Sequence, residues 1–170
     1  MNRREALAGL LALAAPTLCR AQEGGPAAFV VRDRDGRALG SAGLLGRITL
    51  VHFWASWCAS CRTEFPALAA LHRDFAPQGL RLLAVSIDRL GWPVIDATLR
   101  TVGTPELPAY HDLNREAAAS MRVEALPTTV ILDAQGREIE RHKGAVDWAD
   151  AEVRGRLGLL LQGTSIVRAD

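Results

Sequence analysis

Two apolar runs separated by a helix-sized segment constrain the fold of this chain most. Residues 48–55 and 80–87 are rich in β-branched and aliphatic side chains with little polar alternation, which is typical of strands buried on both faces. Between them, Leu68, Leu71 and Phe75 recur at helical spacing. A strand, a helix and a strand in that order favour a parallel pair with a right-handed crossover. The sequence therefore predicts an α/β fold with 48–55 as its central strand.

Shorter elements are expected on either side of this unit. A strand at 29–31 precedes it. After it comes an inserted block, with a helix that opens at Trp92 and a helical turn or two at 115–121. A strand at 128–132 and a hairpin partner at 137–142 then form an antiparallel pair at the edge of the sheet.

A final helix closes the predicted domain. Asp147 is its expected N-cap, with Asp150 three residues later in the capping-box position. Apolar side chains from Trp148 to Leu161 recur at helical spacing. The 170 residues fit one domain with a short appendage, so we expect a single domain at 29–170.

The first 21 residues have the layout of a secretory signal peptide. Arg3 and Arg4 form a positive start, residues 6–18 form an apolar run, and Ala21 is a small residue suited to cleavage. The run is shorter than the roughly 20 residues that cross a bilayer as a helix. We therefore expect a signal peptide at 1–21, its removal, and a periplasmic or otherwise exported protein.

Details of this export remain open in the sequence. The paired arginines fit a twin-arginine signal and an ordinary one equally well. Cys19 is a weaker candidate for lipid attachment, because Leu18 stands before it where such signals want a small residue. Residues 22–28 form a lead-in that carries Gly and Pro and has no periodicity.

Removal of the signal peptide leaves two cysteines, Cys58 and Cys61. A disulfide scaffold needs several pairs that join distant segments, whereas two cysteines separated by two residues staple nothing. In an exported protein, a lone Cys-x-x-Cys pair favours a redox dithiol. The formal net charge of +1 gives no basic surplus, so we expect no nucleic-acid partner.

The position of Cys58 suits a nucleophile. It falls where the strand 48–55 gives way to a helix, and unpaired N–H groups and the helix dipole favour an anion there. The thiolate is the attacking species, and such placement lowers the pKa of a thiol. Cys61 lies one turn further on the same face, deeper, and is the predicted resolving thiol. Ala59 and Ser60 carry no charge and leave the reduction potential open.

Two neighbours of the dithiol are further candidates. Glu64 lies three residues past Cys61 on the same helix face, and we hypothesise that its carboxylate takes or returns the proton on Cys61. The alternative is that Glu64 is simply a favourable acid in the first turns of a helix. Trp57 either shields the sulfurs or fills a surface groove, and shielding is the preferred interpretation.

Pro127 leads into the strand 128–132. A proline at this point has no N–H for a strand ladder, and a cis peptide bond would place it against the dithiol. Taken alone the signal is weak, because proline often precedes a strand.

These residues together carry a resemblance. The segment 53–66 with its Trp-Cys-x-x-Cys motif, the Leu-Pro-Thr-Thr-Val of 126–130 and the Asp-Ala-Gln-Gly-Arg of 133–137 resemble the thioredoxin superfamily, and within it the exported TlpA/ResA/CcmG-like group. The match runs from about 29 to 161. It implies a thioredoxin fold, with a central mixed sheet flanked by helices and a helical insertion before the proline strand. It also implies dithiol–disulfide exchange and a cis proline facing the cysteines at Pro127.

The resemblance also implies site residues and partners. It implies a functional acid at Glu64, and we expect Trp57, Leu126 and Thr128 to line a substrate groove shaped by Pro127. Members of this group usually reduce disulfides on cytochrome c maturation or copper-site proteins and are recharged by a membrane thiol transporter. We therefore expect client proteins with cysteine pairs, that transporter as electron donor, reduction as the direction, a monomer, and no cofactor.

The chain departs from the family at His52. Cytosolic thioredoxins carry a buried Asp at this position, and many TlpA-like proteins carry Asn. His52 points to the same side as Leu50 and Trp54, so it is either a hydrogen-bonded core histidine or a titratable neighbour of the dithiol. The core interpretation is preferred.

Functions other than reduction remain open in the sequence. A disulfide-donating oxidase would use the same dithiol. A copper or other metal-delivery module would use Cys58, Cys61 and a histidine. However, His72, His111 and His142 are scattered and are expected at the surface, so no metal site is predicted. A thiol peroxidase would need its cysteine in a loop that contains Pro and Thr, and a non-catalytic binding domain would not need Cys58.

Overall fold

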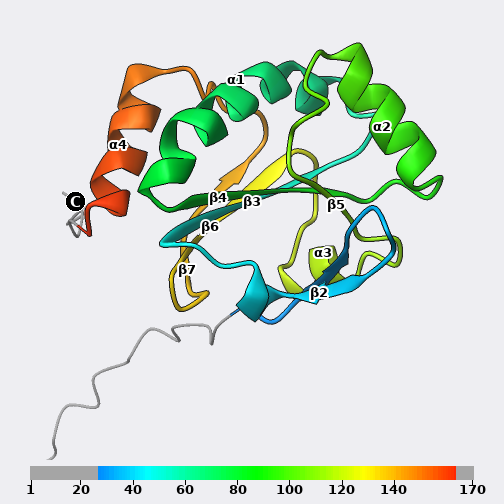
Figure 1. The fold of residues 1–170 in the computed structure, drawn as a ribbon, viewed down its shortest axis with the longest axis horizontal. Coiled ribbons are helices and arrows are strands. Elements are labelled where there is room, and N and C mark those ends of the chain that lie inside the picture. Colours follow the sequence, from blue (N-terminus) through cyan, green and yellow to red (C-terminus); the bar gives the residue numbers. More distant parts are fainter. Residues whose placement is uncertain (1–26, 164–170) are drawn as a thin grey trace, which may run out of the picture.

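The central feature of the fold is a mixed sheet, which a computed structural model describes within residues 27–163 (Figure 1). In that part of the chain the sheet has seven strands in the order β2-β1-β5-β4-β3-β6-β7. The predicted signal peptide at 1–21, the lipid alternative at Cys19 and most of the lead-in lie outside the described residues.

The elements follow the order expected from the sequence. The strands are β1 (Val30–Arg32), β2 (Ala38–Gly40), β3 (Ile48–Trp54), β4 (Leu80–Ser86), β5 (Ala109–His111), β6 (Thr128–Asp133) and β7 (Glu138–Lys143). The helices are α1 (Ala59–Phe75), α2 (Trp92–Thr101), α3 (Glu116–Ser120) and α4 (Ala151–Leu161), with short 3₁₀ turns at Ser41–Gly43 and Ala76–Gln78. None of the helices in residues 27–163 has both the length and the apolar character needed to cross a membrane.

The predicted strand, helix and parallel strand are confirmed as β3, α1 and β4. The two strands pair in parallel from Ile48 opposite Leu80 to Trp54 opposite Ser86. Every residue of β3 is buried, because β4 and the antiparallel β6 cover both of its sides and helices cover its faces. One detail is wrong: β4, and not β3, is the middle strand of the seven.

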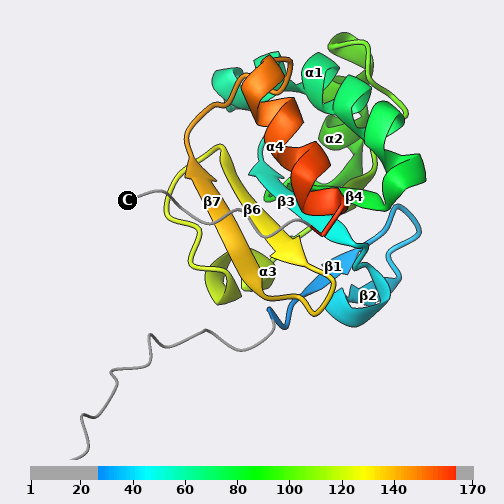
Figure 2. The same cartoon turned by 90° about the vertical axis from the view of Figure 1, so that its left-hand side faces the viewer.

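Helices cover both faces of the sheet, and alternate residues of each strand enter different cores (Figures 1 and 2). Leu50 and Trp54 face the core beneath α1, α2 and α4, which also contains both cysteines. Val51 and Phe53 face the opposite core, where α3 contributes Ala117. The alternation fixes which residues of β3 lie behind the dithiol, since the face that carries α1 is the face of Leu50 and Trp54.

The closing helix starts later than predicted. Asp150, and not Asp147, is the N-cap of α4, and its carboxylate accepts from the backbone N–H groups of Glu152 and Val153. Asp147 instead accepts from the N–H of Ala149 in the preceding turn. That turn carries Trp148 inward to full burial before the helix begins. Burial of the Trp148 side chain in the core therefore accompanies an N-cap of α4 three residues later than predicted.

Candidate active site

Cys58 and Cys61 form a disulfide where β3 passes into α1. Cys58 is the N-cap of the helix, and the two Cα atoms are 5.3 Å apart. Cys58 is 7% exposed and Cys61 is fully buried. The expected order of depth is thus confirmed, and a partner in solution reaches the sulfur of Cys58 first.

The sulfur of Cys58 lies among hydrogen-bond donors. The backbone N–H of Cys61 donates to it at 3.2 Å, and the hydroxyl of Ser60 lies 3.5 Å away. These groups belong to the first turn of a 17-residue helix, whose N–H groups and dipole favour negative charge. The surroundings are suited to a thiolate at Cys58.

Pro127 lies beside the end of β3. The Leu126–Pro127 peptide bond is cis, as the resemblance implies. Thr128 pairs with Phe53, so Pro127 comes next to the last residue of β3, just before the loop that leads to Cys58. Pro127 is buried, and half-buried Leu126 packs on the core that contains both cysteines.

The expected groove residues differ in accessibility. Trp57 is 70% exposed and stands directly before Cys58. Thr128 is buried, and its hydroxyl donates to the carbonyl of Ala125 at 2.8 Å. Their contact with a substrate stays a prediction. The exposed indole of Trp57 can contact a partner, whereas the hydroxyl of Thr128 is buried.

Asp88 holds the loop before Cys58 through hydrogen bonds, and its place after a buried strand was the only local sequence feature that pointed to it. Its carboxylate accepts from the N–H and hydroxyl of Ser56, at 2.8 and 2.6 Å, and from the hydroxyl of Ser86 at 2.8 Å. Its carbonyl accepts from the ring of His111 at 2.7 Å. The expectation that His111 lies at the surface is wrong, because this bond joins it to a buried network.

Replacing Asp88 with alanine should destabilise the fold. Three hydrogen-bond donors around a buried carboxylate would lose their acceptor, which we expect to lower the free energy of unfolding by about 3 kcal/mol. Asp88→Asn is the matched control, because it keeps one carbonyl oxygen in place and should lose about 1 kcal/mol. Urea unfolding followed by circular dichroism measures both, and equal losses in the two variants would refute the role given to the carboxylate.

Glu64 is buried behind the cysteines, one helical turn past Cys61. Its Oε1 atom accepts from the backbone N–H of Val146 at 2.9 Å and from the indole N–H of Trp148 at 2.8 Å. Burial raises the pKa of Glu64, and these two donors partly offset the rise. Both interpretations of Glu64 stay predictions, and a buried carboxyl with a raised pKa fits the hypothesis of proton exchange with Cys61.

His52 is fully buried on the same face of β3 as Leu50 and Trp54. Its Nδ1 atom lies 2.9 Å from the hydroxyl of Thr129. Burial lowers the pKa of His52 to about 3, so the imidazole is neutral near pH 7. The preferred interpretation of a hydrogen-bonded core histidine is confirmed, and the ring also faces Glu64.

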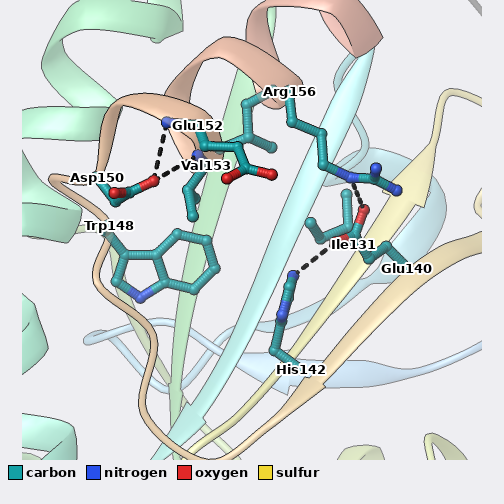
Figure 3. A pocket seen from close by; sticks show the side chains of 9 residues that line it. Ile131, Glu140, His142, Trp148, Asp150, Glu152, Val153 and Arg156 are labelled. Carbon is teal, nitrogen blue, oxygen red and sulfur yellow. Dashed lines mark hydrogen bonds and ion pairs between the residues drawn. The ribbon is translucent and has the colours of Figure 1, made fainter. Parts of the chain in front are cut away.

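A pocket of about 280 Å³ lies behind this arrangement, between β7 and α4 (Figure 3). Trp148 forms part of its wall, and the indole N–H of the same residue donates to Glu64. On the rim, Glu140 pairs with His142 at 2.9 Å and with Arg156 at 2.6 Å. His142 is only partly exposed, and its ring meets Trp148 edge to face. Trp148 thus connects the wall of this pocket to Glu64.

Within residues 27–163, no three His, Cys, Asp or Glu residues gather in a way that could hold a metal ion.

Comparisons with known proteins give consistent matches. Residues 24–139 match the model of the AhpC/TSA family. The chain is 29% identical over 112 residues to the thiol-disulfide oxidoreductase ResA of Bacillus subtilis, which covers 66% of this chain and 62% of the relative. It is 34% identical over 116 residues to the thiol:disulfide interchange protein DsbE of Allochromatium vinosum, which covers 63% of this chain and 59% of the relative. The chain therefore spans less than two thirds of each relative.

Solved structures share the fold. A thiol:disulfide interchange protein from a Bacteroides species superposes with a TM-score of 0.70 at 19% identity, covering 85% of this chain and 93% of the other. The thioredoxin domain of a thiol-disulfide oxidoreductase from Bacteroides vulgatus gives a TM-score of 0.69 at 17% identity, covering 83% and 98%. At these identities the likeness concerns the fold alone.

Proposed function

Since the chain belongs to the AhpC/TSA family and has a thioredoxin-like fold, we propose that it is a thiol:disulfide oxidoreductase that works through Cys58 and Cys61. The observation that carries the proposal is the disulfide at the start of α1, with one sulfur near the surface and the other buried behind it. This is the arrangement that an attacking thiol and a resolving thiol require. The names of the ResA and DsbE relatives support the same activity.

The exchange proceeds in two steps that balance in electrons and protons. The Cys58 thiolate attacks one sulfur of a client disulfide, and the other client sulfur leaves as a thiolate and takes a proton from water. Cys61 then gives its proton to Glu64 and attacks the sulfur of Cys58. The second client sulfur leaves as a thiolate and likewise takes a proton from water. Two electrons have passed to the client, which is now a dithiol, and Cys58 and Cys61 are oxidised to the disulfide.

A more specific proposal concerns the cellular location of the protein, its clients and its electron donor. We propose an exported protein that reduces disulfides of client proteins, of the cytochrome c maturation or copper-site type, and that receives electrons from a membrane thiol transporter. The layout of residues 1–21 supports export. Cys61 is inaccessible to solvent, so a protein donor must also enter through Cys58. We propose that Trp57, Leu126 and Pro127 shape the surface on which these partners bind.

The reduction potential of the purified protein tests the proposal. The protein is equilibrated in glutathione or dithiothreitol buffers, and alkylation of Cys58 and Cys61 reports the reduced fraction. A reductase is expected near the thioredoxin value of about −270 mV, whereas a value near −120 mV would make the protein a disulfide donor. If no reversible disulfide forms at any potential, the proposed function is refuted.

A further inference from the structure

Two buried polar atoms face each other behind the dithiol without a hydrogen-bond partner. They are Nε2 of His52 and Oε2 of Glu64, and among residues 27–163 neither has a donor or acceptor within bonding distance. The atoms lie 4.0 Å apart, and the two side chains are 0% and 4% exposed. Buried polar atoms are nearly always hydrogen-bonded, because leaving one unpaired is costly. This pair therefore calls for a physical explanation.

The remaining polar atoms of both side chains already have partners. Oε1 of Glu64 accepts from Val146 and Trp148, and Nδ1 of His52 is engaged with the hydroxyl of Thr129. Two further neighbours of His52 are apolar: the ring of Phe65 lies edge to face with the imidazole, with 6.1 Å between the ring centroids, and Ala84 pairs with His52 on β4. Nε2 of His52 and Oε2 of Glu64 are thus the only potential partners of each other among the described residues. A rotation of the Glu64 carboxyl that shortens the distance between these two atoms by roughly 1 Å makes a hydrogen bond.

We propose that His52 and Glu64 hold one proton between Nε2 and Oε2, and that His52 is a positioning residue that sets when Glu64 accepts the proton of Cys61. This proposal rests on the proposed function, because it concerns the proton that the resolving thiol must lose. It assigns a role in exchange to the histidine by which this chain departs from its family.

The pair is complementary in both protonation states of Glu64. When the carboxyl is ionised, Nε2–H donates to Oε2, and the hydroxyl of Thr129 donates to Nδ1. When the carboxyl is protonated, Oε2–H donates to Nε2, and Nδ1–H donates to the same hydroxyl. Thr129 serves both states because a hydroxyl is both donor and acceptor. The low pKa of His52 keeps the imidazole neutral throughout, so only its tautomer changes.

The proton balance of the step has two parts. One proton leaves the sulfur of Cys61 and binds Oε2 of Glu64. The imidazole changes tautomer by exchange with water, which takes the proton of Nε2 and returns one to Nδ1, so the ring keeps a single proton. The Cys61 thiolate then forms the bond to Cys58 and the client sulfur leaves. No other oxidant or reductant is needed. Glu64 regains its charge when this proton passes to solvent.

The tautomer of His52 tests the proposal directly. Nitrogen NMR on the full protein labelled with ¹⁵N-histidine shows which ring nitrogen carries the proton at each pH, in the oxidised and the reduced forms. The expected result is a change from Nδ1–H to Nε2–H as pH rises, with no imidazolium between pH 5 and 9. In Glu64→Gln the tautomer is expected to be constant over this range. A wild-type tautomer that does not change with pH would overturn the proposal.

Reactivity of Cys61 gives a second, independent test. In the reduced protein, loss of the His52 donor raises the pKa of Glu64, because an ionised carboxyl loses more from a missing donor than a neutral one loses from a missing acceptor. Glu64 must be ionised to accept the proton of Cys61, so His52→Leu should move the midpoint of the pH profile of Cys61 alkylation upward by about one unit. His52→Gln is the conservative variant, since its amide offers both a donor and an acceptor near the Nε2 position, and it should restore most of the shift. Equal profiles in His52→Leu and wild type would refute the proposal.

Failure of this proposal is distinguishable from failure of the proposed function. If the protein reduces insulin disulfides while its His52 tautomer stays constant, the role of His52 is refuted and the oxidoreductase stands. If no reversible Cys58–Cys61 disulfide forms, the oxidoreductase is refuted, and the role of His52 with it.

Discussion

Replacing Cys58 with serine is expected to abolish disulfide exchange, with a loss of rate of about 10³-fold or more, because a hydroxyl cannot replace the attacking thiolate. Cys58 is the N-cap of α1, and its sulfur receives the N–H of Cys61. Serine is also a good N-cap, so the variant should fold. The loss then reports on chemistry and not on stability.

Cys61→Ser is the matched variant for this experiment. It retains the first attack but lacks the thiol that releases the client, so a mixed disulfide through Cys58 should accumulate. Turnover of insulin disulfides measures the rate, and non-reducing electrophoresis followed by mass spectrometry identifies the mixed disulfide. Accumulation in Cys58→Ser, or turnover in either variant at a rate near that of the wild type, would contradict the assignment of nucleophile and resolving thiol.

Stability should fall in acid because of His52. Burial lowers the pKa of this histidine from 6.5 to about 3 in the folded state. Below pH 6.5 the unfolded chain therefore binds a proton that the folded protein does not bind. The contribution of His52 to stability is fully present above pH 6.5 and is lost as pH falls toward 3, at up to about 1.4 kcal/mol per pH unit.

Glu64 acts in the opposite direction. Its pKa is raised by burial, so the folded protein holds this proton more tightly than the unfolded chain. That contribution is present at low pH and is lost as pH rises through the raised pKa. The two groups thus oppose each other where their titrations overlap, and the acid slope of the wild type is the difference between them.

Variants separate the two contributions. His52→Leu should remove most of the acid slope, whereas His142→Asn should keep it, because the side chain of His142 is 29% exposed and lies outside the buried pair. Urea unfolding at several pH values between 4 and 8 gives the free energy of each variant. A wild-type slope that persists in His52→Leu would show that the titration belongs to another group.

The strands and the helix that depend on residues close in sequence were predicted from local patterns. The apolar runs of β3 and β4 and the helical spacing after Cys58 depend on residues close in sequence, and those elements are confirmed. The strand β2 (Ala38–Gly40) was missed, because its short, largely exposed segment has no apolar alternation and forms only by pairing with β1.

Contacts between distant segments explain most of what the sequence did not predict in the site. Glu64 was placed near Cys61 by helical spacing, but its burial depends on Trp148, which is 84 residues away. The network of Asp88 likewise joins Ser56, in the loop after β3, to His111, the last residue of β5. Such bonds follow from tertiary packing, so no local pattern indicates them. The cis bond at Pro127 was predicted through the family resemblance, since proline before a strand is common.

The limited exposure of Cys58 has a consequence for when a client can react. With 7% of this residue open to solvent, a client disulfide must protrude far enough to bring one of its sulfurs into line with the thiolate. A disulfide recessed in a rigid, mature protein cannot make that approach, whereas one on an extended or still unfolded segment can. Under the proposed function, the low exposure of Cys58 therefore favours client disulfides on extended or unfolded segments over disulfides recessed in a folded protein.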